Sequence, residues 1–403
     1  MSRKAQNKMR GFLGKTFLLA CFLLLSCPVY SAQDPDEIIR NLAVKQKGVW
    51  VSCFSEHKVL YSPQAVRELV HFCRANGINE IYLQLYRAGQ AYFDSGFGDI
   101  TKYEEMVKAA GADCIDELLK EAKKNKIKVY AWVNVLNIAT NKSADIISKY
   151  GEIVLTKDQY LRNSLKSENK NETDKYYLRD EQLFLEPGAP LVVDYQLQIL
   201  SELIKRYPGL AGIHLDYIRY PNPLPYIPDS RFTKFGLSYG YGENNLARFT
   251  EETGLDPLKM SDERDNALRW DNWKRDQVSA LVENISLLIQ EIAPEMQLSC
   301  AVIASPERAY TTAYQDWPLW LESAVVDYVV LMNYTTDLRL AKEVSAAALA
   351  QRGGGRVCVG VGTFLMREKP ELFFQQCASL TEELDLDGIV FFSYDDLRAI
   401  LAP

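Results

Sequence analysis

The stretch GIHLDYIRYP, residues 212–221, has the pattern of a buried β-strand that ends in polar residues. Its apolar residues Ile213 and Leu215 alternate with His214 and Asp216, so the two pairs of side chains face opposite sides of a strand. A carboxylate on the inner face of a core is costly unless it is paired or has a function. The stretch therefore predicts a strand within a larger sheet, with Asp216 as a candidate functional residue.

Other apolar segments of the same kind occur along the chain, and helical patterns separate them. The strand candidates are residues 47–54, 80–86, 128–134, 212–220, 297–304, 327–334, 357–363 and 388–394. Such alternation favours parallel strands that are covered on both faces. Eight units over roughly 350 residues predict an α/β fold of the (β/α)8 TIM barrel type. A doubly wound open sheet is the alternative, but no GxGxxG loop follows the first strand.

Two long, mostly polar segments interrupt this pattern, at residues 138–184 and 222–266. They follow the third and fourth strands, so both loop insertions are expected on the C-terminal face of the barrel, where barrel enzymes build their sites. The sequence shows no internal repeat and no separate domain. The predicted organisation is a signal peptide at 1–32, a polar lead at 33–46 and one TIM-barrel domain at 47–403.

Residues 1–32 have the layout of a secretory signal, with a basic head, a short apolar run and small residues at its end. The apolar run of about a dozen residues is too short for a comfortable membrane span. Leu24–Cys27 fits the bacterial lipobox, which makes Cys27 a candidate for lipid attachment at the membrane. Cleavage near Ser31 or Ala32 and an uncut N-terminal anchor are the alternatives. Export to the periplasm or cell envelope is expected in either cleaved form.

The composition excludes several classes of function. The net charge is −7, and no long basic run follows residue 15, so nucleic acid is not expected as a partner. The three histidines form no HxH or HExxH motif, and neither a metal nor a cofactor is expected. The single GxSxG match, GLSYG at 236–240, lies within the segment 222–266 and not at the end of a predicted strand, so no nucleophile elbow is present and a serine hydrolase is disfavoured. The six cysteines after residue 32 lack CxxC spacing and are predicted to be buried thiols.

The strand ends carry aromatic, amide and carboxylate side chains, a combination that suits a sugar. Cleavage of a glycosidic bond needs two carboxyl groups, one on each side of the bond. Asp216 is the first candidate, and Arg219 is close enough in sequence to keep it ionised. Glu307 and Asp395 are the candidates for the second group, and Glu186 is a further option. The candidate substrate-binding residues are Gln84, Tyr86, Arg87, Trp132, Asn134, His214, Arg219, Asp316, Asn333, Tyr334 and Tyr394.

Structural interpretations of these residues remain open beside the functional ones. Asp316 and Asp395 are each followed by a helical pattern that they would cap. His214 is also interpretable as a core histidine bonded to a neighbour, and Tyr86 and Trp132 as barrel packing. Asp216 itself has the alternative role of a structural partner of Arg219.

At these residues the sequence resembles the glycosyl hydrolase-like 10 family of bacterial envelope proteins. The most specific segments are AGIHLDYIRYP (211–221) and YQDWPLWLESAVVDYVVLMNYTTD (314–337). The resemblance implies a TIM barrel, an exported or lipoprotein location and action on glycan chains, and some relatives are linked to peptidoglycan. It carries site residues over only for His214, Asp216 and Arg219. Many relatives have LNPG where this chain has LEPG, with Glu186 in place of the asparagine.

These observations lead to one hypothesis and two rivals. The hypothesis is an exported glycoside hydrolase acting on a bacterial cell-wall or related amino-sugar polysaccharide, with Asp216 as nucleophile or charge stabiliser and Glu307 as general acid. The main rival is a non-catalytic glycan-binding envelope lipoprotein on the same barrel. The second rival is an envelope scaffold recruited by protein contacts, which predicts an exposed apolar patch.

Overall fold

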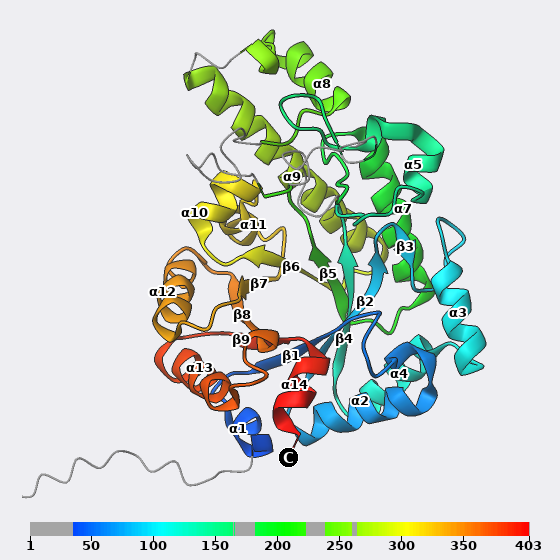
Figure 1. Ribbon diagram of the computed structural model, residues 1–403, viewed down its shortest axis with the longest axis vertical. Coiled ribbons are helices and arrows are strands. Elements are labelled where there is room, and N and C mark those ends of the chain that lie inside the picture. The colour runs from blue at the N-terminus through cyan, green and yellow to red at the C-terminus, as the bar shows by residue number, and fades with distance from the viewer. Residues whose placement is uncertain (1–34, 164, 166–181, 223–237, 260–263, 403) are drawn as a thin grey trace, which may run out of the picture. The chain divides into compact units, whose positions relative to one another are not determined.

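The computed structural model describes residues 35–163, 165, 182–222, 238–259 and 264–402. The predicted signal peptide with Cys27, and parts of both predicted insertions, lie outside the described residues. Within the described part, nine strands form one sheet, in which only β3 runs antiparallel to its neighbour. Because β1 pairs with both β2 and β9, the sheet closes on itself as a barrel (Figure 1). The predicted TIM barrel is confirmed.

The eight strand segments predicted from the sequence all form barrel strands. The strands are β1 (Gln46–Val51), β2 (Glu80–Arg87), β3 (Gln90–Ala91), β4 (Lys128–Asn134), β5 (Gly212–Asp216), β6 (Gln297–Ile303), β7 (Tyr328–Asn333), β8 (Arg356–Gly362) and β9 (Gly388–Phe392). The helices are α1 (Pro35–Asn41), α2 (Pro63–Ala75), α3 (Thr101–Ala110), α4 (Cys114–Lys124), α5 (Asp145–Tyr150), α7 (Pro190–Arg206), α8 (Glu243–Thr253), α9 (Arg264–Ile292), α10 (Pro306–Arg308), α11 (Trp317–Glu322), α12 (Leu338–Leu349), α13 (Pro370–Glu383) and α14 (Tyr394–Leu401).

Several helices begin where a side chain can accept a hydrogen bond from the first free backbone N–H groups. Ser62 accepts from the N–H of Gln64 at 3.2 Å and starts α2, with Pro63 in the first helical position. Asp113 starts α4 and Asp337 starts α12 in the same way. These caps fix where each loop ends and the next helix begins.

The strands are apolar on both faces because one face lines the barrel and the other contacts the helices. On β5, Ile213 and Leu215 belong to the large outer core, whereas His214 points to the inside, as the alternation predicts. The inner cluster is unusually aromatic for so small a space. It consists of Trp50, Tyr82, Tyr130, Trp132, Ala301, Tyr328, Val330, Cys358 and Val390.

The predicted polar lead at 33–46 is not simply polar. It contains α1, whose residue Ile39 is fully buried, and Leu42 follows it into the core. The Arg40 guanidinium donates to the backbone oxygen of Ala75 at the end of α2. The lead therefore packs against the barrel domain.

We call residues 151–163, 238–259 and 264–274 the insertion lobe; it combines described parts of the two insertions with the first turns of α9. It has its own small core, in which the rings of Trp270 and Trp273 stack at 5.4 Å and Phe249 packs against both. The backbones of the two insertions meet directly, since the N–H of Gln159 donates to the oxygen of Ser238 at 3.2 Å. Among the helices described, none is long and apolar enough to cross a membrane.

Replacing the inner tryptophan tests how far the fold depends on the aromatic interior. Trp50 is 2% exposed and contacts the rings of Tyr82, His214 and Phe392. Trp50→Ala should lower the free energy of unfolding by about 3 to 5 kcal/mol, because it leaves a cavity that the barrel cannot close. Urea denaturation measures this loss. Leu287→Ala, at a 62% exposed site, is the control and should change little; a loss for Trp50→Ala as small as the control's would contradict the argument.

Candidate functional site

Asp216 is the last residue of β5, and its carboxyl group lies at the barrel mouth, meaning the ring of C-terminal strand ends. The residue is only 8% exposed. Both carboxyl oxygens accept hydrogen bonds: Oδ1 from the backbone N–H of Tyr217 at 2.7 Å and Oδ2 from Nε1 of Trp132 at 3.0 Å. The carboxyl group is therefore held in one orientation from two sides.

Tyr217 follows Asp216 in a left-handed backbone conformation, with φ of 51°. This conformation costs an L-residue about 1–2 kcal/mol and is rare outside glycine, asparagine and aspartate. Backbone strain of this kind concentrates at functional sites. Here it turns the chain sharply at the end of β5 and brings the Tyr217 N–H onto the carboxylate.

Burial raises the pKa of the Asp216 carboxyl above its usual value. The Tyr217 N–H, the positive charge of Arg219 and the Trp132 N–H each lower this pKa, but together they do not offset burial. The net shift is opposite to the one that Arg219 led us to expect. The guanidinium of Arg219 lies 4.9 Å from the Tyr217 ring and donates to the backbone oxygen of Tyr220.

Amide side chains lie beside Asp216 on the inner side of the mouth. Asn134 pairs in register with Asp216, so the two side chains point to the same side of the sheet. Oδ1 of Asn134 accepts from Nε2 of Gln84 at 3.2 Å, and Oε1 of Gln84 accepts from the N–H of Cys53 at 3.4 Å. Nδ2 of Asn134 makes no hydrogen bond to any described residue, so it remains as a donor for a substrate hydroxyl.

Aromatic rings line another part of the mouth. Tyr334 stacks on Phe392 with ring centres 5.5 Å apart, and Phe364 meets both rings edge-on. Trp132 contacts Phe392 from the other side at 6.1 Å. Burial and the nearby charge of Asp216 raise the pKa of the Tyr334 hydroxyl, which places this ring in the surroundings of the carboxyl group. The arrangement gives an apolar wall next to hydrogen-bonding groups.

Three aromatic residues of this mouth, Phe54, Phe364 and Phe392, were not predicted. Phe54 is 64% exposed, with the guanidinium of Arg87 at 4.7 Å from its ring. Phe392 could have been found, because it lies two residues after the inward-facing Val390 and alternation puts both on one side. Phe54 and Phe364 lie beyond the strand ends, where no periodicity fixes the direction of a side chain.

Tyr86 does not face the mouth, although alternation from Gln84 predicts that it does. The register of β2 against β4 shifts between these two residues: Gln84 pairs with Trp132 and Tyr86 with Val133. This irregularity turns Tyr86 to the outer side, where it is 1% exposed within the core beneath the helices. Its assignment to substrate binding is therefore corrected to packing.

Asn333 and Tyr394 are also corrected to structural roles. Asn333 lies on the outer face of β7, and its Nδ2 donates to the backbone oxygen of Ala341 and to Ser345, both on α12. Tyr394 begins α14 and packs edge-on against Phe72 of α2. At 1% exposure its ring is enclosed between helices and has no face open to a ligand.

His214 points into the barrel but lies one inward-facing position before Asp216. It is fully buried against Trp50 and Tyr82, and its Nδ1 is 2.9 Å from Oγ of Ser299. Burial lowers the pKa of His214 to about 3, so the ring is neutral at physiological pH. The structure corrects His214 from a substrate contact to a core histidine.

The other predicted acidic residues, Glu307, Asp395 and Asp316, lie in different surroundings. Glu307 is exposed on α10, and among the described residues no hydrogen bond joins it to Asp216. Asp395 accepts hydrogen bonds from Ser55 and from the N–H of Glu56, so its carboxyl group holds the loop after β1. Asp316 occupies the position before α11 without a side-chain cap bond, and burial raises the pKa of its carboxyl group.

Glu186 is a fully buried carboxyl group that connects the insertions. Its oxygens accept from Nδ2 of Asn245 at 2.7 Å and from the N–H of Gly242 at 3.1 Å. Burial raises the pKa of Glu186 to about 7. These hydrogen bonds hold the backbone at Gly242 and the side chain of Asn245 against the segment after the first insertion.

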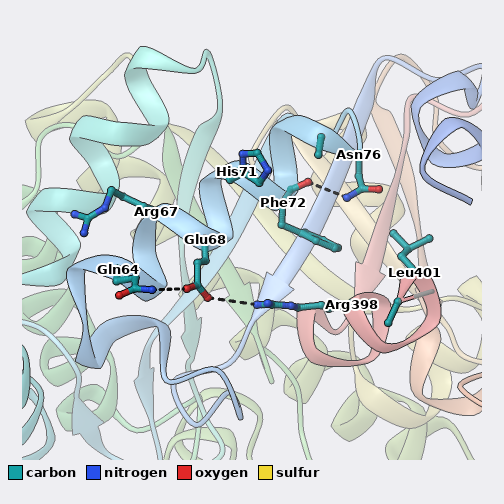
Figure 2. A pocket seen from close by; sticks show the side chains of 10 residues that line it. Gln64, Arg67, Glu68, His71, Phe72, Asn76, Arg398 and Leu401 are labelled. Atoms are coloured by element: carbon teal, nitrogen blue, oxygen red, sulfur yellow. Dashed lines mark hydrogen bonds and ion pairs between the residues drawn. The ribbon is translucent and has the colours of Figure 1, made fainter.

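A cavity of about 610 Å³ lies on the outside of the barrel between α2 and α14 (Figure 2). Its central carboxylate, Glu68, accepts from Gln64 at 3.0 Å and lies 3.8 Å from Arg398. These polar groups satisfy one another, so we assign no catalytic role to this cavity. Within the described ranges, no group of three or more His, Cys, Asp or Glu side chains is placed to hold a metal ion. All six described cysteines are free and buried, as predicted.

Comparison with known proteins adds to this geometry. A family model described as glycosyl hydrolase-like 10 matches residues 45–354. The chain is 22% identical over 304 residues to glycosyl hydrolase DigH of Escherichia coli O6:H1, covering 71% of this chain and 61% of that protein. It is 21% identical over 275 residues to glycosyl hydrolase YngK of Bacillus subtilis, covering 64% of this chain and 46% of that protein. The chain thus spans about half of the length of these relatives.

Among solved structures, a β-galactosidase from Bacillus circulans sp. alkalophilus superposes with a TM-score of 0.52 at 12% identity. The superposition covers 88% of this chain and 51% of that one. At this level of identity the likeness supports the barrel fold alone.

The neutral state of His214 predicts a pH dependence of stability. The folded pKa of about 3 lies below the usual 6.5, so the unfolded chain binds the extra proton as the pH falls from 6.5 towards 3. This residue should therefore remove about 1.4 kcal/mol of stability for each pH unit in that window. His214→Gln should flatten the fall in unfolding free energy between pH 6.5 and pH 4.5, measured by urea denaturation. Parallel pH curves for the two proteins would contradict the assignment.

Proposed function

Because the chain belongs to the glycosyl hydrolase-like 10 family, we propose that it is a glycoside hydrolase whose reaction centres on Asp216 at the barrel mouth. The observation that carries the proposal is the oriented, buried carboxyl group of Asp216 beside a free amide donor and an aromatic wall. A sugar ring needs these three elements: a stacking surface, hydrogen-bond partners for its hydroxyls and a carboxyl group at the bond that breaks.

The environment of Asp216 favours a role as proton donor over the nucleophile first assigned to it. A general acid must carry its proton at the start of the reaction, and burial raises the pKa of Asp216 in that direction. Trp132 and Tyr217 keep the carboxyl group in position during the transfer. Asn134 donates to a sugar hydroxyl, and Tyr334 and Phe392 stack on the apolar face of the ring.

The second carboxyl group is the open part of this mechanism. Glu307, exposed on α10 after the neighbouring strand β6, is the proposed partner. Because the partner of Asp216 is not established, the non-catalytic glycan-binding barrel stays as the second candidate function. It would keep the aromatic wall and tolerate the loss of the Asp216 charge.

As substrate we propose glycan strands of the bacterial cell wall or a related amino-sugar polymer. The secretory pattern of residues 1–32 and the resemblance to envelope proteins support this choice. The same pattern supports export to the periplasm or cell envelope, and Cys27 in the lipobox is the candidate for lipid attachment. No cofactor enters the mechanism.

Digestion of purified glycan strands, with and without stem peptides, tests the proposed activity. Wild-type protein should release new reducing ends, detected by mass spectrometry, and Asp216→Asn should reduce the rate about 10²- to 10⁴-fold, because the amide cannot transfer the proton. Glu307→Gln should cause a similar loss if it is the partner. Asp385→Asn is the control, since its side chain is 93% exposed and pairs with Arg352. Intact binding without cleavage by wild type would favour the glycan-binding alternative.

The hydrogen bond from Trp132 offers a test of the protonation state of Asp216. Trp132→Phe keeps an aromatic ring but removes the N–H donor, which stabilises the carboxylate. The pKa of Asp216 should therefore rise further, because a donor that favours its charged form is lost. If Asp216 is the general acid, the alkaline limb of the pH–rate profile moves to higher pH, because the carboxyl group stays protonated up to a higher pH. Movement of the acid limb alone would instead make Asp216 the nucleophile.

A further inference from the structure

A second cavity lies in the insertion lobe and has no described lining residue in common with the barrel mouth. Its volume is about 430 Å³, within the range of roughly 300 to 1,000 Å³ typical of small-molecule sites. We call it the lobe pocket. It is lined by Gln159, Tyr160, Ser238, Tyr241, Pro257, Leu258, Ala267, Trp270 and Asp271.

Tyr160 carries an exposed ring, and a buried residue holds its backbone in place. Asp158 is fully buried, and its Oδ1 accepts from the N–H groups of Tyr160 and Arg162, both at 2.9 Å. The guanidinium of Arg162 bonds to Oδ2 of Asp158 at 3.1 Å and lies 4.9 Å from the Tyr160 ring. Although this ring is 54% exposed, its backbone is fixed. A large ring held open to solvent suits ligand binding, because little freedom is lost when the ligand arrives.

The other side of the pocket rests on the small core of the lobe. Tyr241 is half-buried and its ring lies 5.4 Å from that of Trp270, which in turn stacks on Trp273. Pro257 and Leu258 add apolar surface, and Leu258 is 43% exposed. The aromatic surface is therefore rigid.

Hydrogen-bonding groups lie at the edge of this apolar surface. Oδ1 of Asp271 is 3.1 Å from Nζ of the buried Lys274 and accepts from the Tyr314 hydroxyl at 3.0 Å. Oδ2 of Asp271 makes no hydrogen bond to any described residue and stays available as an acceptor. The described lining residues include one acidic side chain, Asp271, and no Lys or Arg, which favours a neutral ligand over an anion.

The lobe stands beyond the barrel mouth. Helix α9 has 29 residues and is about 44 Å long, whereas α7, which packs beside it, has 17 residues and is about 26 Å long. Trp270 and Asp271 lie in the first turns of α9, at the end opposite to the turn into β6. Figure 1 shows this end of α9 with α8, projecting from the barrel. The Lys274–Tyr314 hydrogen bond of 2.7 Å connects the lobe to the segment after β6.

We propose that the lobe pocket is a second, non-catalytic carbohydrate-binding site that holds a neutral part of a glycan chain away from Asp216. Stacking rings, an apolar floor and an oriented carboxylate acceptor are the groups that bind a sugar ring and its hydroxyls. The ligand class rests on the proposed function, but binding at the lobe pocket does not require catalysis. The site would keep a polymer attached while another part of it occupies the barrel mouth.

Binding by the full-length Asp216→Asn protein tests the proposal without turnover. The probes are peptide-free cell-wall glycan strands, chitin, cellulose and starch, in sedimentation assays. Tyr160→Ala should weaken the binding of at least one of these polymers about tenfold, and Asp271→Asn should weaken binding to the same polymer. The control is Leu287→Ala, an exposed apolar residue on α9 outside the lobe pocket. With Asp216 intact, Tyr160→Ala should raise KM for that polymer and leave kcat for a short soluble oligosaccharide unchanged.

The outcomes separate this proposal from the proposed function. Polymer binding that depends on Tyr160 and Asp271, in a protein whose wild type cleaves nothing, supports the lobe pocket and removes the hydrolase. Cleavage by wild type, with Tyr160→Ala and Asp271→Asn binding every polymer as the control does, overturns the lobe pocket and leaves the hydrolase. The absence of binding to all four polymers by the Asp216→Asn protein also overturns the lobe pocket.

Discussion

The pairing of β1 with both β2 and β9 is the constraint on which the rest of the structure depends. A parallel sheet that closes on itself brings the C-terminal ends of all its strands to one rim. Trp132 on β4 and Phe392 on β9 are far apart in sequence and in strand order, yet closure brings their rings to 6.1 Å from each other at this rim. The composition of the mouth therefore depends on closure, because no single segment carries all of its polar and aromatic groups.

The carboxyl group at this rim shows how burial and hydrogen bonding act against each other. Burial favours the neutral form of Asp216, while the donors Trp132 and Tyr217 favour the charged form. Burial prevails, but the two donors fix the geometry. The pKa of the carboxyl group is thus shifted in the direction that a proton donor requires, and the two hydrogen bonds keep the group from rotating.

Unlike the short loops of the barrel, the insertions form a hydrophobic core of their own. They contribute a small aromatic core of their own, built on the first turns of α9, and a buried carboxyl group, Glu186, that holds their backbones together. In the function that we propose, the barrel holds the reaction centre and the lobe adds binding surface beyond it. A polymer is the kind of substrate for which such a division is useful, because it is long enough to occupy both.

The sequence by itself determined the barrel, its strands and the position of Asp216. Alternating apolar residues and strand–helix alternation are local properties, and they survive in the folded chain because burial on both faces demands them. The same local pattern gave the wrong prediction for Tyr86, because a register shift in β2 turns its side chain to the outer face of the sheet. It did not predict the directions of the Phe54 and Phe364 rings, which lie beyond the ends of β1 and β8.

Only the tertiary structure decided which polar residues are available for chemistry. His214 and Asp216 share a face of β5, but one is enclosed by Trp50 and Tyr82 while the other reaches the rim. Asn333 and Asp395 have side chains of the kind that bind or cleave sugars. In the structure, Asn333 is hydrogen-bonded to α12 and Asp395 to Ser55 in the loop after β1. Burial and hydrogen-bond partners depend on contacts between distant segments, and a sequence pattern records only what lies nearby.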